Sequence, residues 1–562
     1  MNSCADLGGM PLLLERMFAR SAPLHIWRGR DAVETIPADL LLAHAQATAR
    51  RLAHLGIAPG SLVALGFPAR AEFVSTLLGT WLCGATAVVL SPAALADGGA
   101  GASMQLGAVA AAYPHRLLLH DRVDAPWSAA IGAKAISLEH LAGLPEACSA
   151  RPESARAAAA ALLQFTSGST GAPKAVPLDF AMLAANCRAI AERAAIGSTD
   201  HIVSWLPLNH DMGMVAITMA LWSDATLTLL PTDTFSANPV AWLEAVSAQR
   251  GTLSPNPVFA YGLLARFGPR LQRLGVDLSS LRYAWAGAEP VFPGVLSAFA
   301  SALAPCGLRE TALQPAYGMA EAVVAVTGGR AGEPYRVLQV DGMLFRRDGR
   351  VRAVAPGSDG ALAFVSNGAP LDGVRVRVID EAGTPLPDGC EGEILVAGPN
   401  VATGYLPLQE GERFAGGWFR TGDLGFLYDR ELYVSGRRKD LLIRGGVKVG
   451  ARHVESCAEA VLGLRAGQVG AFSYMDHAAG REEIVLVVGR AIAGEEARQA
   501  RLDVARAVAN GSGLQADRIE FVNSARLPRT TSGKLMRGLL RDLWAQGRLT
   551  GTTKEEVHEP VV

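Results

Sequence analysis

LLQFTSGSTGAPKAV, residues 162–176, joins a short apolar strand to a loop of glycine and hydroxyl residues. The glycines allow a tight backbone turn, so that amide N–H groups can converge on phosphate oxygens. A Walker loop places its lysine directly after a glycine and before a serine or threonine, whereas Lys174 follows Pro173 and precedes Ala175. A flexible surface loop has a similar composition, but the preceding strand and the Pro-Lys pair argue against it. We therefore predict a phosphate-binding loop of a different type, formed by Thr166, Ser167, Gly168, Ser169, Thr170, Gly171 and Lys174.

On both sides of this loop, helical patterns alternate with short apolar runs that are rich in β-branched residues. Three such runs are Ser61–Phe67, His201–Pro207 and Ala225–Leu230. Continuous apolar strands between helices are typical of parallel sheets that are covered on both faces. The pattern predicts an α/β protein whose large N-terminal domain contains parallel sheets flanked by helices.

From about Gly360 the pattern changes to short strands separated by glycine, proline and aspartate turns, which predicts a small antiparallel barrel or sheet. These strands are Val374–Asp380, Gly392–Gly398 and Glu431–Gly436. Helices and strands then alternate again to the C-terminus. Because 562 residues exceed one ordinary core, we expect a large domain over residues 1–438, which includes the β-barrel subdomain, and a small mobile α+β domain over residues 439–562.

The charges of the chain balance almost completely, with 52 Lys and Arg against 53 Asp and Glu. This balance gives no broad basic surface for nucleic acid or an anionic membrane. The apolar stretch Phe73–Leu90 contains two glycines and ends in a β-branched run, so it predicts a buried helix and strand rather than a membrane span. The seven cysteines are scattered without a C-x-x-C pair, and the N-terminus does not resemble a secretion signal. We therefore expect a cytoplasmic protein with reduced thiols.

Further motifs follow the loop in order along the chain, namely WLPLNHDMG (205–213), AGAEP (286–290), AYGMAE (316–321), FRTGDLG (419–425), GRRKD (436–440) and RTTSGKLMR (529–537). Together with TSGSTGAPK, they resemble the signatures of the adenylate-forming superfamily, and among its members most closely the fatty acyl-AMP ligases. The resemblance covers the whole chain. It implies an ATP-dependent enzyme that uses Mg2+, activates a carboxylic acid as its acyl-adenylate and passes the acyl group to a thiol.

This chemistry requires few reactive side chains. A carboxylic acid with a pKa of about 4–5 is already ionised at neutral pH, so its attack on the α-phosphate needs no general base. Charge repulsion and alignment are the obstacles, and positioning and electrostatic stabilisation are expected to dominate. The motifs accordingly offer cations, a carboxylate and nucleotide contacts.

The resemblance assigns roles to individual residues. Lys534 would bridge the attacking carboxylate and the α-phosphate, and Glu321 would bind Mg2+. Asp423 would hold the ribose hydroxyls, with Arg437 as a second ribose or phosphate contact. Lys439 would be the hinge about which the small domain turns between adenylation and thiol transfer.

The remaining assignments concern the adenine and the acid. The nucleotide would lie against Gly287, Ala288, Glu289, Pro290, Tyr317, Gly318 and Met319. His210 stands where the family carries a histidine or aromatic residue near the carboxylate, although a lone histidine is more often a packed, hydrogen-bonded side chain. From their residue types, we also expect six apolar side chains near the pocket, which suggests an apolar acid: Trp205, Met212, Met214, Tyr261, Trp285 and Met319.

The stretch Tyr335–Pro370 resembles the insertion that distinguishes fatty acyl-AMP ligases from acyl-CoA synthetases. In those ligases the insertion restrains domain movement and is associated with loss of CoA use. The resemblance thus implies an acyl carrier protein as the acceptor. Three features depart from those ligases: Gly171 in place of arginine, GGVKVGARHVE at Gly445–Glu455, and the Asn in Ser366–Gly368.

Three alternatives remain open at this point. An acyl-CoA or aryl-CoA synthetase would carry the same motifs. A stand-alone amino-acid adenylation domain would need an acidic residue for the α-ammonium group, and Asp211 is nearby in the sequence. A non-catalytic relative would only bind nucleotide or a partner, and against it stand five retained residues: Lys174, Glu321, Asp423, Arg437 and Lys534.

Overall fold

The structure is a computed structural model of the whole chain. It describes residues 11–91, 94–95, 99–121, 132–146, 160–166, 174–407, 414–444, 447–476, 481–529 and 535–549. Ser167, Gly168, Ser169, Thr170, Gly171 and Lys534 therefore lie outside the described residues.

Two sheets form the large body of the protein. The first runs in the order β17-β14-β13-β12-β11-β9-β10-β1-β2, and the second in the order β6-β5-β3-β4-β7-β8. The first contains β1 (Leu24–Gly29), β2 (Ala32–Ile36), β9 (His201–Ser204), β10 (Thr226–Leu229), β11 (Leu253–Pro257), β12 (Tyr283–Gly287), β13 (Leu313–Gly318), β14 (Ala325–Gly328) and β17 (Ala369–Pro370). The second contains β3 (Leu62–Gly66), β4 (Thr86–Val89), β5 (Arg116–His120), β6 (Lys134–Ser137), β7 (Leu162–Thr166) and β8 (Lys174–Leu178). The inner strand pairs of both sheets are parallel, and the antiparallel pairs lie at the edges.

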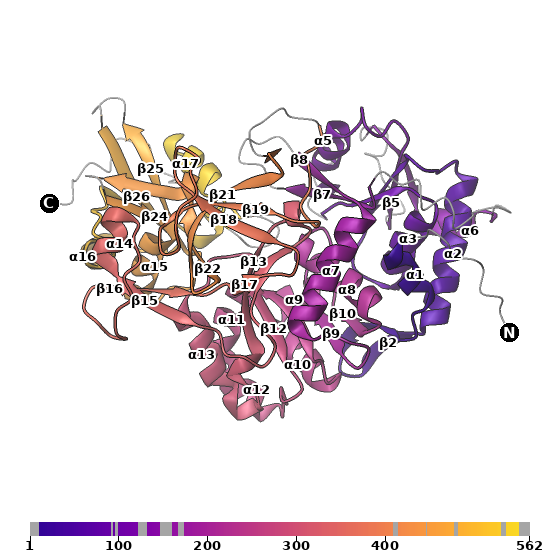
Figure 1. Cartoon of the computed structure of the whole chain (residues 1–562), viewed down its shortest axis with the longest axis horizontal. Helices are drawn as coiled ribbons and strands as arrows, with labels where there is room; N and C mark the ends of the chain where they lie inside the picture. The colour runs from indigo at the N-terminus through magenta and orange to yellow at the C-terminus, as the bar shows by residue number, and fades with distance from the viewer. Residues whose placement is uncertain are drawn as a thin grey trace.

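Helices cover both faces of these sheets (Figure 1). They are α1 (Leu12–Phe18), α2 (Ala38–His54), α3 (Ala71–Leu82), α5 (Ala100–Ala108), α6 (Leu138–Gly143), α7 (Phe180–Ala194), α8 (Asp211–Ser223), α9 (Thr232–Ala237), α10 (Val240–Ala248), α11 (Val258–Leu264), α12 (Gly268–Arg273) and α13 (Pro293–Leu303). On β9, Ile202 packs with α7 and α8 while the next residue, Val203, packs with α10 and α11. Successive residues of a strand point to opposite faces, so both must be apolar when both faces are buried. The predicted α/β class is confirmed.

The stretch Phe73–Leu90 forms the buried helix α3 followed by the buried strand β4, as predicted. All residues of α3 from Phe73 to Leu82 are buried inside the protein. Among the described residues, no helix combines the length and hydropathy that crossing a membrane requires.

A curled antiparallel sheet follows in the chain and confirms the second predicted architecture (Figure 1). It runs in the order β18-β19-β21-β20, with β22 also paired to β21. Its strands are β18 (Arg375–Ile379), β19 (Gly392–Ala397), β20 (Phe414–Ala415), β21 (Trp418–Tyr428) and β22 (Glu431–Arg437). The predicted insertion, residues 335–370, contains the strand pair β15 (Val337–Asp341) and β16 (Ala361–Val365), with helix α14 (Gly342–Asp348) between them.

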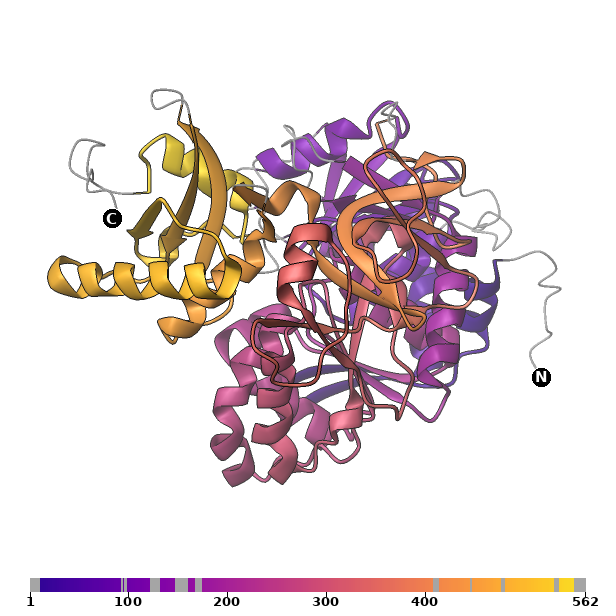
Figure 2. The ribbon, with the colours of Figure 1, turned by 60° about the vertical axis from the view of Figure 1, so that its left-hand side comes forward.

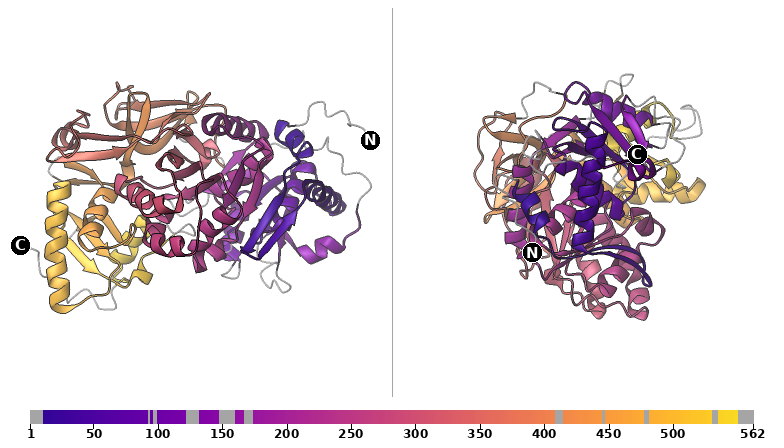
Figure 3. Two further views of the ribbon diagram at one scale, coloured as in Figure 1. Left: turned by 90° about the horizontal axis from the view of Figure 1, so that it is seen from below. Right: turned by 90° about the vertical axis from the view of Figure 1, so that its right-hand side faces the viewer.

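The described residues beyond Arg438 form a lobe beside the main body (Figure 2). It consists of β23 (Leu441–Arg444), β24 (Val447–Gly450), β25 (Val469–Asp476), β26 (Arg481–Val488), β27 (Arg518–Phe521), α15 (Ala451–Val461), α16 (Gly494–Ser512) and α17 (Arg537–Ala545). Helix α16 runs along the outer edge of this lobe (Figure 3). Two hydrophobic clusters of the described residues draw on residues 442–549, which supports our proposal that the small domain begins at Lys439.

Candidate active site

A cavity of about 1640 Å³ lies between the large body and the C-terminal lobe. The described residues that were assigned to the phosphates, the nucleotide, the metal, the carboxylate and the hinge all line it: Thr166, Lys174, His210, Gly287, Ala288, Glu289, Pro290, Tyr317, Gly318, Met319, Glu321, Asp423, Arg437 and Lys439. The parallel strands explain much of this convergence, because loops at the carboxyl ends of neighbouring parallel strands meet at one edge of the sheet. Strands β12 and β13 pair in parallel and end at Gly287 and Gly318.

Asp423 joins three elements at one wall of the cavity. Its Oδ2 accepts a 2.8 Å hydrogen bond from the Tyr317 hydroxyl, and its Oδ1 lies 3.0 Å from Nε of Arg437. Asp423 and Arg437 are opposite each other in the β21–β22 ladder, so the strand register brings them together. Burial, and next the charge of Asp423, raise the pKa of Tyr317 well above its usual value, so the phenol remains a hydrogen-bond donor. The Asp423 charge is also the main cause that raises the pKa of Arg437.

The segment Gly287–Pro290, at the end of β12 and just after it, forms part of the cavity wall. A Cβ atom on Gly287 would lie 3.2 Å from the carbonyl oxygen of Ala316 on β13, which is tighter than ordinary packing. Ala288 adopts a left-handed conformation with φ of 64°, which few non-glycine residues adopt. The Glu289 carboxylate lines the cavity, and its Oε2 accepts a 2.8 Å hydrogen bond from the Phe259 amide in the first turn of α11. Glu289 thus also satisfies a helix N-terminus, a role that its motif does not indicate.

The turn that carries Glu321 follows directly after β13. A Cβ atom on Gly318 would lie 1.6 Å from the carbonyl oxygen of Val324, so only glycine fits there. Glu321 is 9% exposed and lies in a short 3₁₀ turn, Ala320–Ala322. The tight turn after β13 therefore places the Glu321 carboxylate at the cavity wall.

The surroundings of Glu321 fit a Mg2+ ion. Among the described residues, no group of three or more His, Cys, Asp or Glu side chains could hold a metal. Mg2+ in nucleotide enzymes is usually held by one or two carboxylates, with phosphate oxygens and water as the other ligands. Glu321 offers one carboxylate to the cavity, and Lys174 on the same cavity would lie near the phosphates that supply the other ligands, which matches this requirement.

His210 lies at the start of α8, where the cavity continues into an apolar region. The cavity follows one face of α8 through Met212, Val215, Ala216 and Met219, and Ile190 and Ile202 also line it. Met212 to Met219 spans about two helical turns, or about 10 Å at the α-helical rise of 1.5 Å per residue. Apolar walls of this kind suit the tail of an apolar acid.

Half of the apolar residues predicted around the acid lie elsewhere. Met212, Trp285 and Met319 line the cavity, whereas Trp205, Met214 and Tyr261 are buried in the core. Trp205 stacks on Phe235 with ring centroids 3.5 Å apart, and the Tyr261 hydroxyl donates to the carbonyl oxygen of Trp285 at 2.6 Å. Trp205, Met214 and Tyr261 are therefore not among the residues that line the cavity, because residue type alone does not give the face toward which a side chain points.

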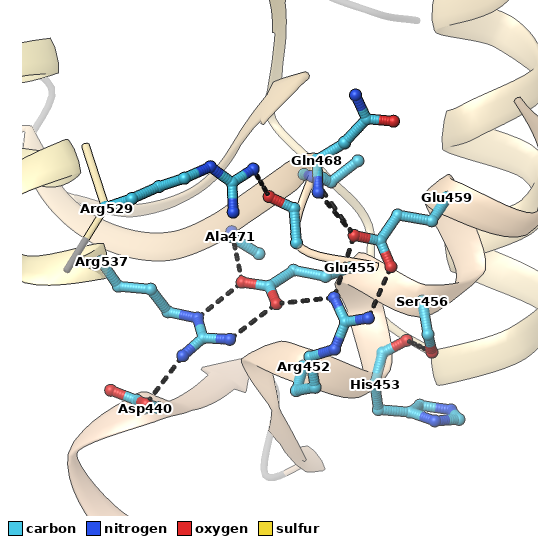
Figure 4. A network of polar contacts seen from close by, with 12 residues as sticks. Asp440, Arg452, His453, Glu455, Ser456, Glu459, Gln468, Ala471, Arg529 and Arg537 are labelled. Atoms are coloured by element: carbon cyan, nitrogen blue, oxygen red, sulfur yellow. Dashed lines mark hydrogen bonds and ion pairs between the residues drawn. The ribbon is translucent and has the colours of Figure 1, made fainter. Parts of the chain in front are cut away.

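The C-terminal lobe presents a charged network to the cavity (Figure 4). Glu455 on α15 is fully buried and accepts hydrogen bonds of 2.6 and 2.7 Å from Arg537, which also lies 3.1 Å from Asp440. Arg452 pairs with Glu459 at 2.6 Å and with Glu455 at 3.3 Å. Burial alone would raise the pKa of Glu455, but the charge and hydrogen bonds of Arg537 outweigh it and lower that pKa.

Sequence reasoning did not assign this network. Asp440 and Arg537 belong to quoted motifs, and the spacing of Arg452, Glu455 and Glu459 places them on one face of a helix. The signal was therefore present, but the pairing of the three segments required the fold. Removing one partner of such a buried pair typically costs about 3–5 kcal/mol, so the network holds the 3₁₀ turn Arg438–Asp440, α15 and the start of α17 together.

Comparison with known proteins agrees with this geometry. Residues 37–406 match the family model described as AMP-binding enzyme. A Caulobacter vibrioides protein, provisionally named an acyl-CoA synthetase, is 32% identical over 537 residues, which cover 93% of this chain and 92% of that protein. The medium-chain-fatty-acid–[acyl-carrier-protein] ligase JamA of Moorena producens is 32% identical over 412 residues, which cover 69% of this chain and 68% of that protein.

Among solved structures, one from a study of fatty acyl-adenylate ligases of E. coli and L. pneumophila superposes with a TM-score of 0.85. It is 30% identical in sequence, and the match covers 96% of this chain and 98% of that one.

Proposed function

The chain belongs to the AMP-binding enzyme family, as an ATP-dependent acyl-AMP ligase, and from this premise we propose that it delivers an acyl group to the phosphopantetheine thiol of an acyl carrier protein. The acid would be a fatty or other apolar carboxylic acid. The apolar walls along α8 support this choice. So do relatives that are named as fatty-acid ligases.

In the first half-reaction, an oxygen of the substrate carboxylate attacks the α-phosphorus of ATP. The bond from the α-phosphorus to the bridging oxygen breaks, and pyrophosphate leaves with the electron pair. Lys174 would neutralise charge on the phosphates, and Asp423, Tyr317 and Arg437 would hold the nucleoside. Their convergence on one cavity is the observation that supports these roles.

Glu321 would hold Mg2+, which would offset the negative charge of the phosphates. From the sequence resemblance, Lys534 would bridge the carboxylate and the α-phosphate. In the second half-reaction, the carrier-protein thiolate attacks the acyl carbon, the C–O bond of the mixed anhydride breaks, and AMP leaves with the oxygen. Rotation about Lys439 would remove Lys534 before this step.

A contact between the insertion and the C-terminal lobe supports a carrier protein over CoA. On α14 in the insertion, Arg346 donates a 2.6 Å hydrogen bond from Nη2 to the carbonyl oxygen of Gly511 in the last turn of α16. A cation at this end of a helix is favoured by the exposed carbonyl groups and the helix dipole. This contact joins the insertion to the lobe that must move, which is the restraint expected of an acyl-AMP ligase.

Pyrophosphate release from Mg-ATP with a panel of acids tests the first half-reaction. CoA and phosphopantetheinylated carrier protein are then offered separately, with carrier protein lacking the phosphopantetheine as the control. We expect thioester on the phosphopantetheinylated carrier protein alone. Thioester on CoA but not on the carrier would instead establish an acyl-CoA synthetase, to which the similarity of the Caulobacter protein points.

A further inference from the structure

The segment Asn400–Pro407 connects the two parts of the cavity wall that carry Lys174 and Glu321. It follows β19 of the curled sheet. Its Leu406 pairs with Ala175 of β8, with N···O distances of 2.7 and 2.9 Å in the two directions. Ala175 is the neighbour of Lys174, so this pairing fixes the segment against the strand that follows the phosphate-binding loop.

The same segment is bonded to the turn that carries Glu321. The amide of Ala402 donates to the backbone oxygen of Glu321 at 2.7 Å, and Nδ2 of Asn400 donates to the backbone oxygen of Ala322 at 2.9 Å. The Tyr405 hydroxyl donates a 2.6 Å hydrogen bond to Oε1 of the Glu321 side chain. Tyr405 is 7% exposed, so this short bond to the carboxylate is shielded from water.

The ring of Tyr405 also contacts Lys174, whose Nζ lies 5.5 Å from the ring centroid. A cation near an aromatic face is attracted by the negative charge of that face. One side chain therefore touches both the candidate phosphate-binding cation and the candidate metal-binding carboxylate.

The turn that Tyr405 supports is strained. Val323 adopts φ of 67° and ψ of −63°, a conformation that is unusual for a β-branched residue. Such conformations persist only where the surroundings impose them, and they are concentrated at functional sites. The bonds from Asn400, Ala402 and Tyr405 supply surroundings of this kind.

We propose that Tyr405 is a positioning residue for adenylate formation: its hydroxyl orients the Glu321 carboxylate toward the metal of Mg-ATP, and its ring holds the Lys174 ammonium group. The proposal rests on the proposed function, since the metal role of Glu321 comes from there. AMP lacks the β- and γ-phosphates, so its binding should depend little on Tyr405, whereas Mg-ATP binding should depend on it strongly.

Equilibrium binding of ATP and of AMP, measured by calorimetry while Mg2+ is varied, tests this role without relying on turnover. Tyr405→Phe removes only the hydroxyl, and Tyr405→Leu also removes the ring. Tyr113→Phe is the matched control, because Tyr113 is 6% exposed, its oxygen lies 3.3 Å from the Thr86 hydroxyl, and it is not among the residues that line the cavity. Glu321→Gln is the reference for loss of the metal ligand.

For Tyr405→Phe we expect Mg-ATP binding to weaken by about tenfold or more, as is typical when a residue that orients a metal ligand is lost. AMP binding should stay within about twofold of the unchanged protein, as should both affinities of Tyr113→Phe. Tyr405→Leu should lose further affinity for ATP. If it does not fold, as judged by thermal unfolding, the Phe variant still decides the matter.

Unchanged Mg-ATP binding by Tyr405→Phe, or an equal loss for ATP and AMP, would overturn the positioning role. If the unchanged protein bound ATP independently of Mg2+ and Glu321→Gln had no effect, the metal assignment of the proposed function would also fall. The two failures are thus distinguishable.

Discussion

The hydroxyl of Tyr317 and the carboxylate of Asp423 are joined by a 2.8 Å hydrogen bond across 106 positions of the chain. Tyr317 is near the end of β13, and Asp423 lies on β21 of the curled sheet. The bond therefore links the parallel sheet to the antiparallel one at the cavity. The Asp423 side chain is only 13% exposed, and this bond fixes the orientation of its carboxylate.

Asp423→Asn is expected to weaken the binding of ATP and AMP alike. An amide has one accepting oxygen and carries no charge, so it cannot satisfy Tyr317, Arg437 and a ribose together. Hydrogen bonds to charged groups contribute about 1.5–3 kcal/mol, which corresponds to about 10- to 150-fold in affinity. Calorimetry with both nucleotides checks this. Asp429→Asn on the same hairpin is the control, because the Asp429 side chain is 68% exposed.

Lys534→Ala is expected to lower adenylate formation by about 10²- to 10³-fold, as for other groups that stabilise transition-state charge. Transfer from supplied acyl-adenylate to the acceptor should remain nearly unchanged, because that step does not require the lysine. Single-turnover assays of each half-reaction measure the two rates. Lys134→Ala, at an exposed position on β6, is the control. Equal loss in both steps would contradict the assigned role.

Arg346→Ala is expected to loosen the insertion from the C-terminal lobe. Loss of its bond to Gly511 should increase hydrogen exchange in the last turn of α16 and allow thioester formation on CoA, which is not expected for the unchanged protein. Arg347→Ala is a close control, since Arg347 is the next residue of α14, is 72% exposed and pairs with Asp348. Identical exchange and acceptor use in the two variants would show that the contact does not restrain the lobe.

Stability is expected to fall in mild acid through His201. Burial, and next the neighbouring His25, lower the pKa of His201 from 6.5 to about 4. Below pH 6.5 the imidazole of His201 is therefore protonated in the unfolded chain, whereas in the folded protein it stays neutral down to about pH 4. The folding stability that is present above pH 6.5 is consequently lost as the pH falls from 6.5 to about 4. The loss is at most about 3 kcal/mol for such a shift.

Urea unfolding of the unchanged protein and of His201→Gln between pH 7.5 and 4.5 measures this effect. The variant should lose less stability than the unchanged protein over that range. His140→Gln, at an exposed position on α6, should follow the unchanged protein. Parallel curves for all three proteins would exclude His201 as the responsible group.

Local patterns were sufficient for much of the fold and the candidate site. Alternation of apolar strands and helices predicted β3, β9 and β10, and the turn-rich region after Gly360 predicted the curled sheet. These features are local because burial on both faces of a strand demands an unbroken apolar run. The motif residues were also identifiable from the sequence. At positions such as Gly318 a Cβ atom would clash with the backbone, so the fold requires glycine there and the motif contains it. The roles of the motif residues, and the domain boundary at Lys439, remain predictions.

Relationships between distant segments could not be obtained in this way. Tyr405 and Glu321 are 84 positions apart, and Arg537 and Glu455 are 82 apart. Trp205 and Tyr261 were expected near the pocket, but the sequence did not show that both side chains are buried in the core. Periodicity shows which side chains avoid water. Which neighbours they meet depends on how sheets and helices stack, and that is a property of the whole packed chain.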